Sequence, residues 1–337
     1  MNRRAVCYEK ENAMKPGFKQ RRRRCGWQGG VCLLLLVALF KTASANKPPI
    51  TDIVFAPDGE SIVAASQLGV QQFRWPDLSL ENTLDVSTPN LHCLAFSPSG
   101  QYLAVGGGRP SEEGVVEVYS WPQREFVARF DDHDDSIRSL VWRDDTTLLT
   151  ASLDRDIKQW QLGTTAIANR FSGHSRGVNS LCLLSDGKTL VSAGADQSLR
   201  VWDLESTKLQ RSLNQHTKSV RALALRPGKD GLPLVASAAG DRLVRLWQPT
   251  IGRMVRYARL DAQPLDIAWT NNGALALAAC VDGNVHAINA DKVTVIKKVP
   301  AIEGWAYTIA VHPKHQTAAV GGTNGQIQKL DLENMTK

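Results

Sequence analysis

Three parts of the chain repeat one set of side chains in the same order: a histidine, a hydroxyl residue, an aspartate and a tryptophan. The sets are His133, Thr150, Asp154 and Trp160; His174, Ser192, Asp196 and Trp202; and His216, Ser237, Asp241 and Trp247. Histidine, hydroxyl and carboxylate are also the members of a nucleophilic triad, in which the carboxylate orients the imidazole and the imidazole activates the hydroxyl. A hydrolase needs one triad, so the threefold recurrence favours an architectural role. We therefore assign no catalytic residue and expect that the protein is not an enzyme.

No other pattern in the sequence predicts catalysis, a metal or a cofactor. The chain has no HExxH pair, no P-loop and no zinc-type cysteine spacing. His312 and His315 are three residues apart without a neighbouring carboxylate, and we expect both to face solvent. The acidic run 131–135 around His133 is a weaker candidate for a cation site, and we interpret it as a solvated loop.

The elements that must position these side chains recur at a regular interval. From residue 50 onward, seven segments each combine short alternating strands with turns such as Pro-Asp-Gly, and they end on an aromatic or apolar residue every 41 to 46 residues. These end positions are Phe73, Tyr119, Trp160, Trp202, Trp247, Ile288 and Leu330. A period of about 40–45 residues indicates one propeller blade per repeat, because a small sheet buries its two faces only against neighbouring sheets. We predict an all-β, seven-bladed propeller over residues 46–337.

The clearest repeat, GHSRGVNSLCLLSDGKTLVSAGADQSLRVWDL at residues 173–204, resembles the WD40 family. The resemblance extends over residues 46–337 and implies four-stranded antiparallel blades. It also implies that each histidine set forms a hydrogen-bonded tetrad, in which the aspartate accepts from the imidazole and the hydroxyl links the imidazole to the indole. The other four repeats lack the full set, and we expect apolar packing to hold them. For function, the resemblance implies a non-enzymatic scaffold that binds proteins or peptides.

The N-terminal segment has the order of a signal peptide. Basic residues including Arg21–Arg24 precede an apolar run at residues 31–40, and Ala43-Ser44-Ala45 forms a small-x-small site. The run is shorter than the roughly 20 residues that a membrane-spanning helix needs. We predict a signal segment at 1–45, cleaved after Ala45, and an exported protein of the bacterial periplasm or cell envelope. An uncleaved membrane anchor and a cytoplasmic protein with a basic arm remain the alternatives.

Removing this segment changes the charge balance of the chain. The full sequence has 40 Lys and Arg against 33 Asp and Glu, of which 10 and 2 lie in residues 1–45, so the remainder carries 30 against 31. A nearly neutral domain disfavours binding to nucleic acid through its overall field. Three cysteines remain, Cys93, Cys182 and Cys280, all within apolar runs, and we interpret them as small core residues.

The last repeat has no sequence for a fourth strand after Leu330. By comparison with the fourth repeat, a strand that closes the ring would occupy residues 39–43, which belong to the predicted signal segment. Cleavage after Ala45 would leave an unpaired edge, and such an edge accepts a strand from another chain. We therefore expect either a strand-donating partner or, without cleavage, closure by residues 39–43.

The resemblance also implies that partners bind on the face formed by the loops between repeats and by the turns between the second and third strands. Six cations lie beside the tetrads on these loops: Arg138, Arg155, Arg176, Lys218, Arg221 and Arg242. If they face one way, they suit an acidic peptide or an anionic polymer; the alternative is a solvated mixed-charge rim. A different class of function, a propeller enzyme or ligand-binding domain, would require carboxylates or histidines at the channel mouth, where His92 is a scattered candidate.

Overall fold

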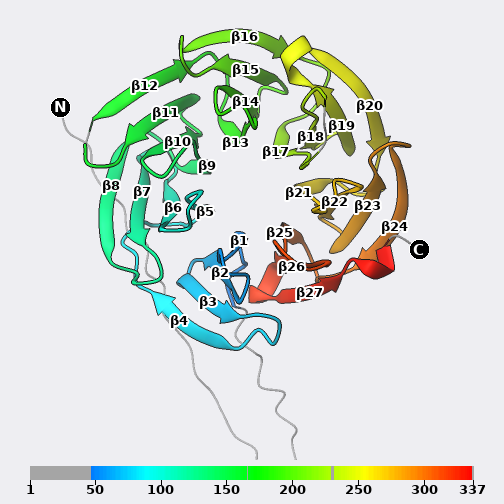
Figure 1. Ribbon diagram of the computed structural model, residues 1–337, viewed down its shortest axis with the longest axis horizontal. Helices are drawn as coiled ribbons and strands as arrows, with labels where there is room; N and C mark the ends of the chain where they lie inside the picture. The colour runs from blue at the N-terminus through cyan, green and yellow to red at the C-terminus, as the bar shows by residue number, and fades with distance from the viewer. Residues whose placement is uncertain (1–46, 165, 229–230, 336–337) are drawn as a thin grey trace, which may run out of the picture. The chain divides into compact units, whose positions relative to one another are not determined.

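Each sequence repeat forms one small antiparallel sheet, and seven sheets stand radially around a central axis (Figure 1). The computed structural model describes residues 47–164, 166–228 and 231–335. Over this part of the chain the prediction of an all-β, seven-bladed propeller is confirmed. The predicted signal segment and its cleavage site lie outside the described residues.

We call the strands of a blade a to d, in sequence order from the axis outward. Blades 1 to 7 contain, in order, β1 Asp52–Phe55, β2 Ser61–Ser66, β3 Gly69–Arg74 and β4 Leu80–Leu84; β5 Cys93–Phe96, β6 Tyr102–Arg109, β7 Glu113–Ser120 and β8 Phe126–His133; β9 Ile137–Trp142, β10 Thr147–Ser152, β11 Asp156–Gln161 and β12 Ile167–Ser172; β13 Val178–Leu183, β14 Thr189–Gly194, β15 Leu199–Asp203 and β16 Lys208–Leu213; β17 Val220–Leu225, β18 Val235–Ala239, β19 Leu243–Gln248 and β20 Arg253–Arg259; β21 Pro264–Trp269, β22 Leu275–Cys280, β23 Asn284–Asn289 and β24 Thr294–Pro300; and β25 Ala306–Val311, β26 Thr317–Gly322 and β27 Ile327–Asp331.

The core lies between blades rather than inside any one of them. Every residue of β2, β10 and β22 is buried, whereas most of the outer strand β16 is exposed. Strand b is apolar at consecutive positions because neighbouring blades cover both of its faces, and strand d carries polar residues because one face meets solvent. Val244 and Leu246 of blade 5, for instance, share one apolar cluster with Ala276 and Ala278 of blade 6.

Hydrogen bonds near the axis join strand a of one blade to strand a of the next. Asp52 accepts from the Leu94 amide at 2.7 Å, and Asp266 accepts from the Ile309 amide at 2.8 Å. Ser139 and Ser180 make the same bond, accepting from the amides of Leu181 at 3.0 Å and Leu223 at 3.1 Å. This belt therefore ties strand a of one blade to strand a of the next at four of the junctions.

Blade 7 contains three strands within the described residues, and there β27 pairs with β26 alone (Figure 1). Its connection to blade 1 uses the Ile50 amide, which donates to the Gly322 carbonyl at 3.0 Å, and the Thr308 hydroxyl, which donates to Asp52 at 3.1 Å. As predicted, no fourth strand follows β27 in the described part of the chain.

Candidate functional site

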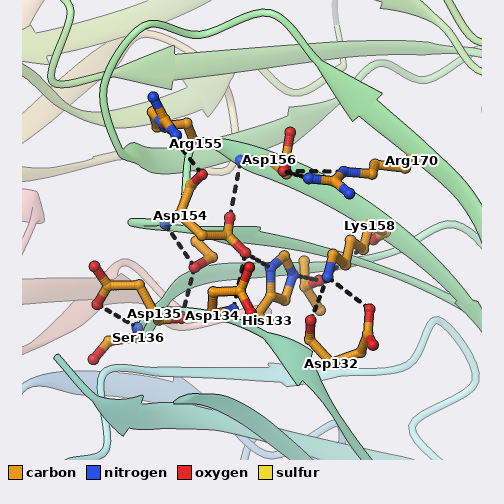
Figure 2. Close-up of polar contacts among 12 residues, drawn as sticks. Asp132, His133, Asp134, Asp135, Ser136, Asp154, Arg155, Asp156, Lys158 and Arg170 are labelled. Atoms are coloured by element: carbon orange, nitrogen blue, oxygen red, sulfur yellow. Dashed lines mark hydrogen bonds and ion pairs between the residues drawn. The ribbon is translucent and has the colours of Figure 1, made fainter. Parts of the chain in front are cut away.

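The histidine of each set lies just before strand a of its blade, the aspartate lies in the b–c turn, the hydroxyl is on strand b and the tryptophan is on strand c. In blade 3, His133 Nδ1–H donates to Asp154 at 2.6 Å (Figure 2). The Thr150 hydroxyl donates to His133 Nε2 at 2.7 Å, and Trp160 Nε1–H donates to Thr150 at 2.9 Å. A proton on His133 Nδ1 suits the carboxylate, which can only accept, and leaves Nε2 to accept from the hydroxyl.

Blades 4 and 5 repeat this geometry closely. The imidazole-to-carboxylate distances are 3.0 Å for His174 with Asp196 and 2.9 Å for His216 with Asp241. The imidazole-to-hydroxyl distance is 2.7 Å in both blades, and the indole-to-hydroxyl distance is 2.8 Å in both; the hydroxyls belong to Ser192 and Ser237 and the indoles to Trp202 and Trp247. Three blades therefore carry one and the same polar network.

Burial decides what these networks can do chemically. Thr150, Ser192 and Ser237 are 0% exposed, and each hydroxyl is already engaged by an imidazole and an indole. A nucleophile must meet its substrate, which these oxygens cannot reach. The networks instead pin the b–c turn to the preceding loop, since a buried polar group without its partner costs about 1–3 kcal/mol.

The carboxylates of the networks are held in their charged form. Burial raises the pKa of Asp154, but the hydrogen bond from His133 and those from two backbone amides outweigh burial and hold the pKa below its usual value. The same balance lowers the pKa of Asp196 and Asp241, where burial is opposed by His174 and His216. Burial also lowers the pKa of His216, which favours its neutral imidazole.

The acidic run at 131–135 does not converge on one point (Figure 2). Asp132 forms an ion pair with Lys158 at 2.8 Å, and Asp131 forms one with Arg129 at 3.3 Å. Asp135 accepts from the backbone amides of Ser111 at 2.9 Å and Ser136 at 2.7 Å. These acids therefore take separate partners in the loop around His133.

The six predicted cations are all exposed, and none of them forms an ion pair with another described residue. The structure does not bring all six together in one pocket. Arg138 and Arg221 line the mouth of the central channel, Lys218 and Arg242 line a groove of about 650 Å³ on blade 5, and Arg155 and Arg176 lie on loops of blades 3 and 4.

One residue from each blade forms a ring at the channel mouth, just before the belt of strand-a hydrogen bonds. This mouth ring consists of Thr51, His92, Arg138, Asn179, Arg221, Leu265 and Tyr307, and it lines a cavity of about 510 Å³. Trp305, half exposed, and Gln263 extend the same wall. The ring therefore combines two guanidinium groups with polar and aromatic neighbours.

The two guanidinium groups have neutral neighbours. Arg138 donates to His92 Nδ1 at 3.0 Å, and the Gln263 amide oxygen, oriented toward Arg221, accepts from its Nε at 2.7 Å. Burial and then the charge of Arg138 lower the pKa of His92 to about 4, so His92 is neutral at pH 7. The surrounding protein lowers the pKa of Arg138, and the charge of Arg221 lowers it further. The mouth ring thus carries two positive charges that repel each other.

Two carboxylates lie one layer deeper, and the sequence reasoning missed them. Asp52 and Asp266 line a narrower cavity of about 180 Å³ together with Thr308. Burial raises the pKa of Asp52 to about 7, with a further contribution from the charge of Asp266, and burial raises the pKa of Asp266 to about 6. The signal that could have found them is the alignment of the repeats, because both occupy the strand-a position that Ser139 and Ser180 fill elsewhere.

These carboxylates are the groups that a channel enzyme or ligand-binding channel would need. Each of them, however, accepts two backbone N–H groups: Asp52 from Ile53 at 2.8 Å and Leu94 at 2.7 Å, and Asp266 from Ile267 and Ile309 at 2.8 Å. Their bonds hold blades together, so this layer is explained by architecture without a ligand.

The expectation that His312 faces solvent is wrong. His312 is 2% exposed; its Nε2–H donates to the Gly59 carbonyl at 3.1 Å, and its Nδ1 accepts from the amides of Lys314 and His315 at 3.0 Å each. The His312 imidazole thus joins blade 7 to blade 1, where the propeller closes. The two residues in this contact are far apart in the sequence. His315 is exposed.

Comparison with known proteins agrees with this geometry. The family model for the WD40 repeat (WD domain, G-beta repeat) matches residues 79–120, 124–161, 166–203 and 207–248, segments that end with β7, β11, β15 and β19. The chain is 30% identical over 131 residues to the UBP9-binding protein bun62 of Schizosaccharomyces pombe, covering 36% of this chain and 23% of that protein. It is 31% identical over 121 residues to WD repeat-containing protein 1 of Bos taurus, covering 34% and 19%.

A third relative, the Periodic tryptophan protein 2 homolog of Neurospora crassa, is 27% identical over 101 residues, which cover 30% of this chain and 11% of that protein. The chain spans less than a quarter of the length of these curated relatives. With its four matched repeats, three tetrads and seven blades, the chain belongs to the WD40-repeat family. Propellers of this family are typically non-enzymatic scaffolds that bind proteins.

No helix in the described part of the chain is long and apolar enough to cross a membrane.

Proposed function

We propose that this propeller is a non-enzymatic scaffold that binds an acidic segment of a partner protein at the mouth ring. The observation that carries the proposal is the pair Arg138 and Arg221. Both guanidinium groups line one cavity, and neither forms an ion pair with a described residue. An incoming carboxylate would relieve their mutual repulsion and gain charge-assisted hydrogen bonds.

The walls of the mouth support a peptide as the ligand. Trp305 is 50% exposed, and its ring centroid lies 5.8 Å from that of Tyr307. Exposed aromatic side chains next to arginines are the residue types that contribute most to protein interfaces. An acidic side chain between the arginines and an apolar side chain against Trp305 would fit the two halves of the mouth.

The proposal also includes export to a bacterial cell envelope. Its support is the order of basic residues, apolar run and Ala43-Ser44-Ala45 in the sequence. A second chain that adds a strand at the outer edge of β27 belongs to the same proposal, because β27 pairs on one side only within the described residues. A cytoplasmic WD40 scaffold is the alternative.

The binding site is tested with labelled peptides. A Glu-rich decapeptide is titrated into the full chain by fluorescence anisotropy, with a Gln-rich decapeptide of equal length as the uncharged control. We expect saturable binding of the Glu-rich peptide that weakens as salt increases. The double variant Arg138→Glu and Arg221→Glu should weaken it at least tenfold, about 1.4 kcal/mol.

The matched control is Arg253→Glu, which reverses one exposed charge on the outer strand β20. This variant should bind like the unmodified protein, since β20 lies at the rim of the propeller (Figure 1). Equal losses in both variants would mean that the peptide responds to net charge, and binding that survives in the double variant would refute the mouth ring as the site.

A further inference from the structure

Blade 6 keeps one member of the tetrad and replaces the other three. Its b–c turn holds Asp282, but the positions of the histidine, hydroxyl and tryptophan hold Leu260, Ala278 and Ile288, all buried. The aspartate of this turn therefore lacks the imidazole that its counterparts have in blades 3 to 5. A different set of polar atoms lies beside it.

Three side chains of this hairpin bring potential metal ligands together. Cys280 ends β22, Asp282 lies in the turn and His286 is on β23. The thiol sulfur, a carboxylate oxygen and an imidazole nitrogen all lie within 4.8 Å of one another, and His286 Nε2 is 3.7 Å from Asp282 Oδ2. Among the described residues, no other group of three His, Cys, Asp or Glu side chains has its ligand atoms within 4.8 Å of one another.

The imidazole of His286 gives a second, independent indication of a ligand. Its side chain is 1% exposed, and Nε2 has no hydrogen-bond partner among the described residues. A buried polar atom without a partner is costly in a folded protein and calls for an explanation. Among the described residues, the Cys280 sulfur makes one hydrogen bond, a long one of 3.6 Å to the Ala278 carbonyl.

A cation already occupies one side of the group. Lys298 on β24 places its ammonium 2.7 Å from Asp282 Oδ2, and its side chain is 40% exposed. A flexible, partly exposed lysine can move aside, and Asp282, 27% exposed, gives a path from solvent. The charge of Asp261 also acts on this region: after the hydrogen bond to Asp282, it helps to raise the pKa of Lys298.

We propose that Cys280, Asp282 and His286 bind a zinc ion. Thiolate, imidazole and carboxylate are the ligands that zinc takes in proteins, at about 2.0–2.3 Å, in a tetrahedral arrangement. Ligand atoms at those distances lie about 3.5 Å from one another. The present spacing, at most 4.8 Å, therefore needs a contraction of up to about 1.3 Å between ligand atoms, shared by the side chains. A water molecule would complete the coordination.

Binding requires the thiol to lose its proton to solvent as the zinc–sulfur bond forms. Because this proton is released, metal affinity should increase with pH. The ion would then tie the b–c turn to strands b and c, whereas the imidazole in blades 3 to 5 ties this turn to the loop before strand a. Because the ion would bind at a b–c turn, the site lies on the same face of the propeller as the b–c turns of the other blades.

The test uses the full chain and Co²⁺ as a spectroscopic substitute for Zn²⁺. We expect a thiolate-to-cobalt charge-transfer absorption that saturates with Co²⁺ and disappears when Zn²⁺ is added. The variant Cys280→Ser should lose this absorption. The matched control, Cys182→Ser, removes another buried thiol, on β13, and should keep the absorption.

A variant that is expected to bind the metal more tightly separates loss of the metal site from misfolding. Lys298→Met removes the ammonium that competes for Asp282, so it should bind Co²⁺ at least threefold more tightly than the unmodified chain. Absorption that persists in Cys280→Ser, or that is absent from the unmodified chain and from Lys298→Met, would overturn the proposal. Equal loss in Cys182→Ser would assign the metal to other thiols and overturn it as well.

Discussion

The substitution Asp196→Ala tests the structural account of the tetrads most directly. Asp196 accepts four hydrogen bonds in blade 4: from His174 Nδ1 at 3.0 Å, from the Ser175 amide at 3.0 Å, and from the amide and hydroxyl of Ser198 at 3.2 and 2.8 Å. Alanine removes all four acceptor positions. The imidazole of His174 is 1% exposed, so solvent cannot replace the carboxylate as its acceptor.

The cost follows from these partners. A buried donor left without an acceptor costs about 1–3 kcal/mol, and each partly exposed amide that exchanges its carboxylate for water loses about 0.5–1 kcal/mol. We therefore expect Asp196→Ala to lower the free energy of unfolding by about 2–4 kcal/mol. The same substitution in blade 6, Asp282→Ala, is the matched control. It removes the acceptor of one backbone amide at 3.2 Å, a partly exposed ion pair with Lys298 and a contact of 3.7 Å with His286 Nε2, which is too long for a hydrogen bond, and should cost less than about 1 kcal/mol.

Equilibrium unfolding in urea, followed by tryptophan fluorescence, measures both values, with a chelator present so that no metal contributes to blade 6. Amide exchange adds a local measurement, because loss of the network should speed exchange in the turn at 195–198. A cost for Asp196→Ala no larger than that for Asp282→Ala would refute the claim that the buried imidazole makes this aspartate structural. Unchanged stability with lost partner binding would assign Asp196 to a binding site instead.

Three further predictions concern other parts of the chain. In the folded state Asp52 and Asp266 keep their protons up to about pH 7 and about pH 6, whereas in the unfolded chain both lose them near pH 3.8. The stability that these protonated carboxyl groups contribute is therefore complete below about pH 4 and is lost as the pH rises through 7. Asp52→Asn should flatten the dependence of the urea midpoint on pH over this range. An unchanged dependence of the urea midpoint on pH in Asp52→Asn would contradict this prediction. Amide exchange should be slower in the b–c turns of blades 3 to 5 than in those of blades 1, 2, 6 and 7; equal protection would show that the tetrads add nothing. The intact mass of the protein from its native cells should correspond to a chain beginning at Asn46, and a chain that retains residues 39–43 would contradict cleavage.

Much of the fold was predictable because its information is local. Alternating strands and turn residues recur in each repeat, and a strand pairs with the strand that follows it, so seven repeats predict seven sheets. The tetrads were visible for the same reason: each spans fewer than 35 residues, from His133 to Trp160 for example.

The channel was not predictable in this way. Arg138 and Arg221 were selected only as loop cations, and nothing in their local sequence separated them from Arg155 or Arg176. They share one cavity because the ring places the same position of strand a from every blade around the axis. His312 was misjudged because its acceptor, the Gly59 carbonyl, lies at the opposite end of the described chain.

The sequence by itself determined the number of blades, the order of strands within them and the polar networks inside blades 3 to 5, since these depend on hydrogen bonds between neighbours along the chain. Only the tertiary structure decided which residues meet at the axis and beside the blade 6 turn. Asp52 and Asp266 face one cavity because closure of the ring, driven by burial of apolar strand faces, brings distant strands together. Cys280, Asp282 and His286 are close in sequence, yet the fold of their hairpin decides that sulfur, oxygen and nitrogen point toward one another.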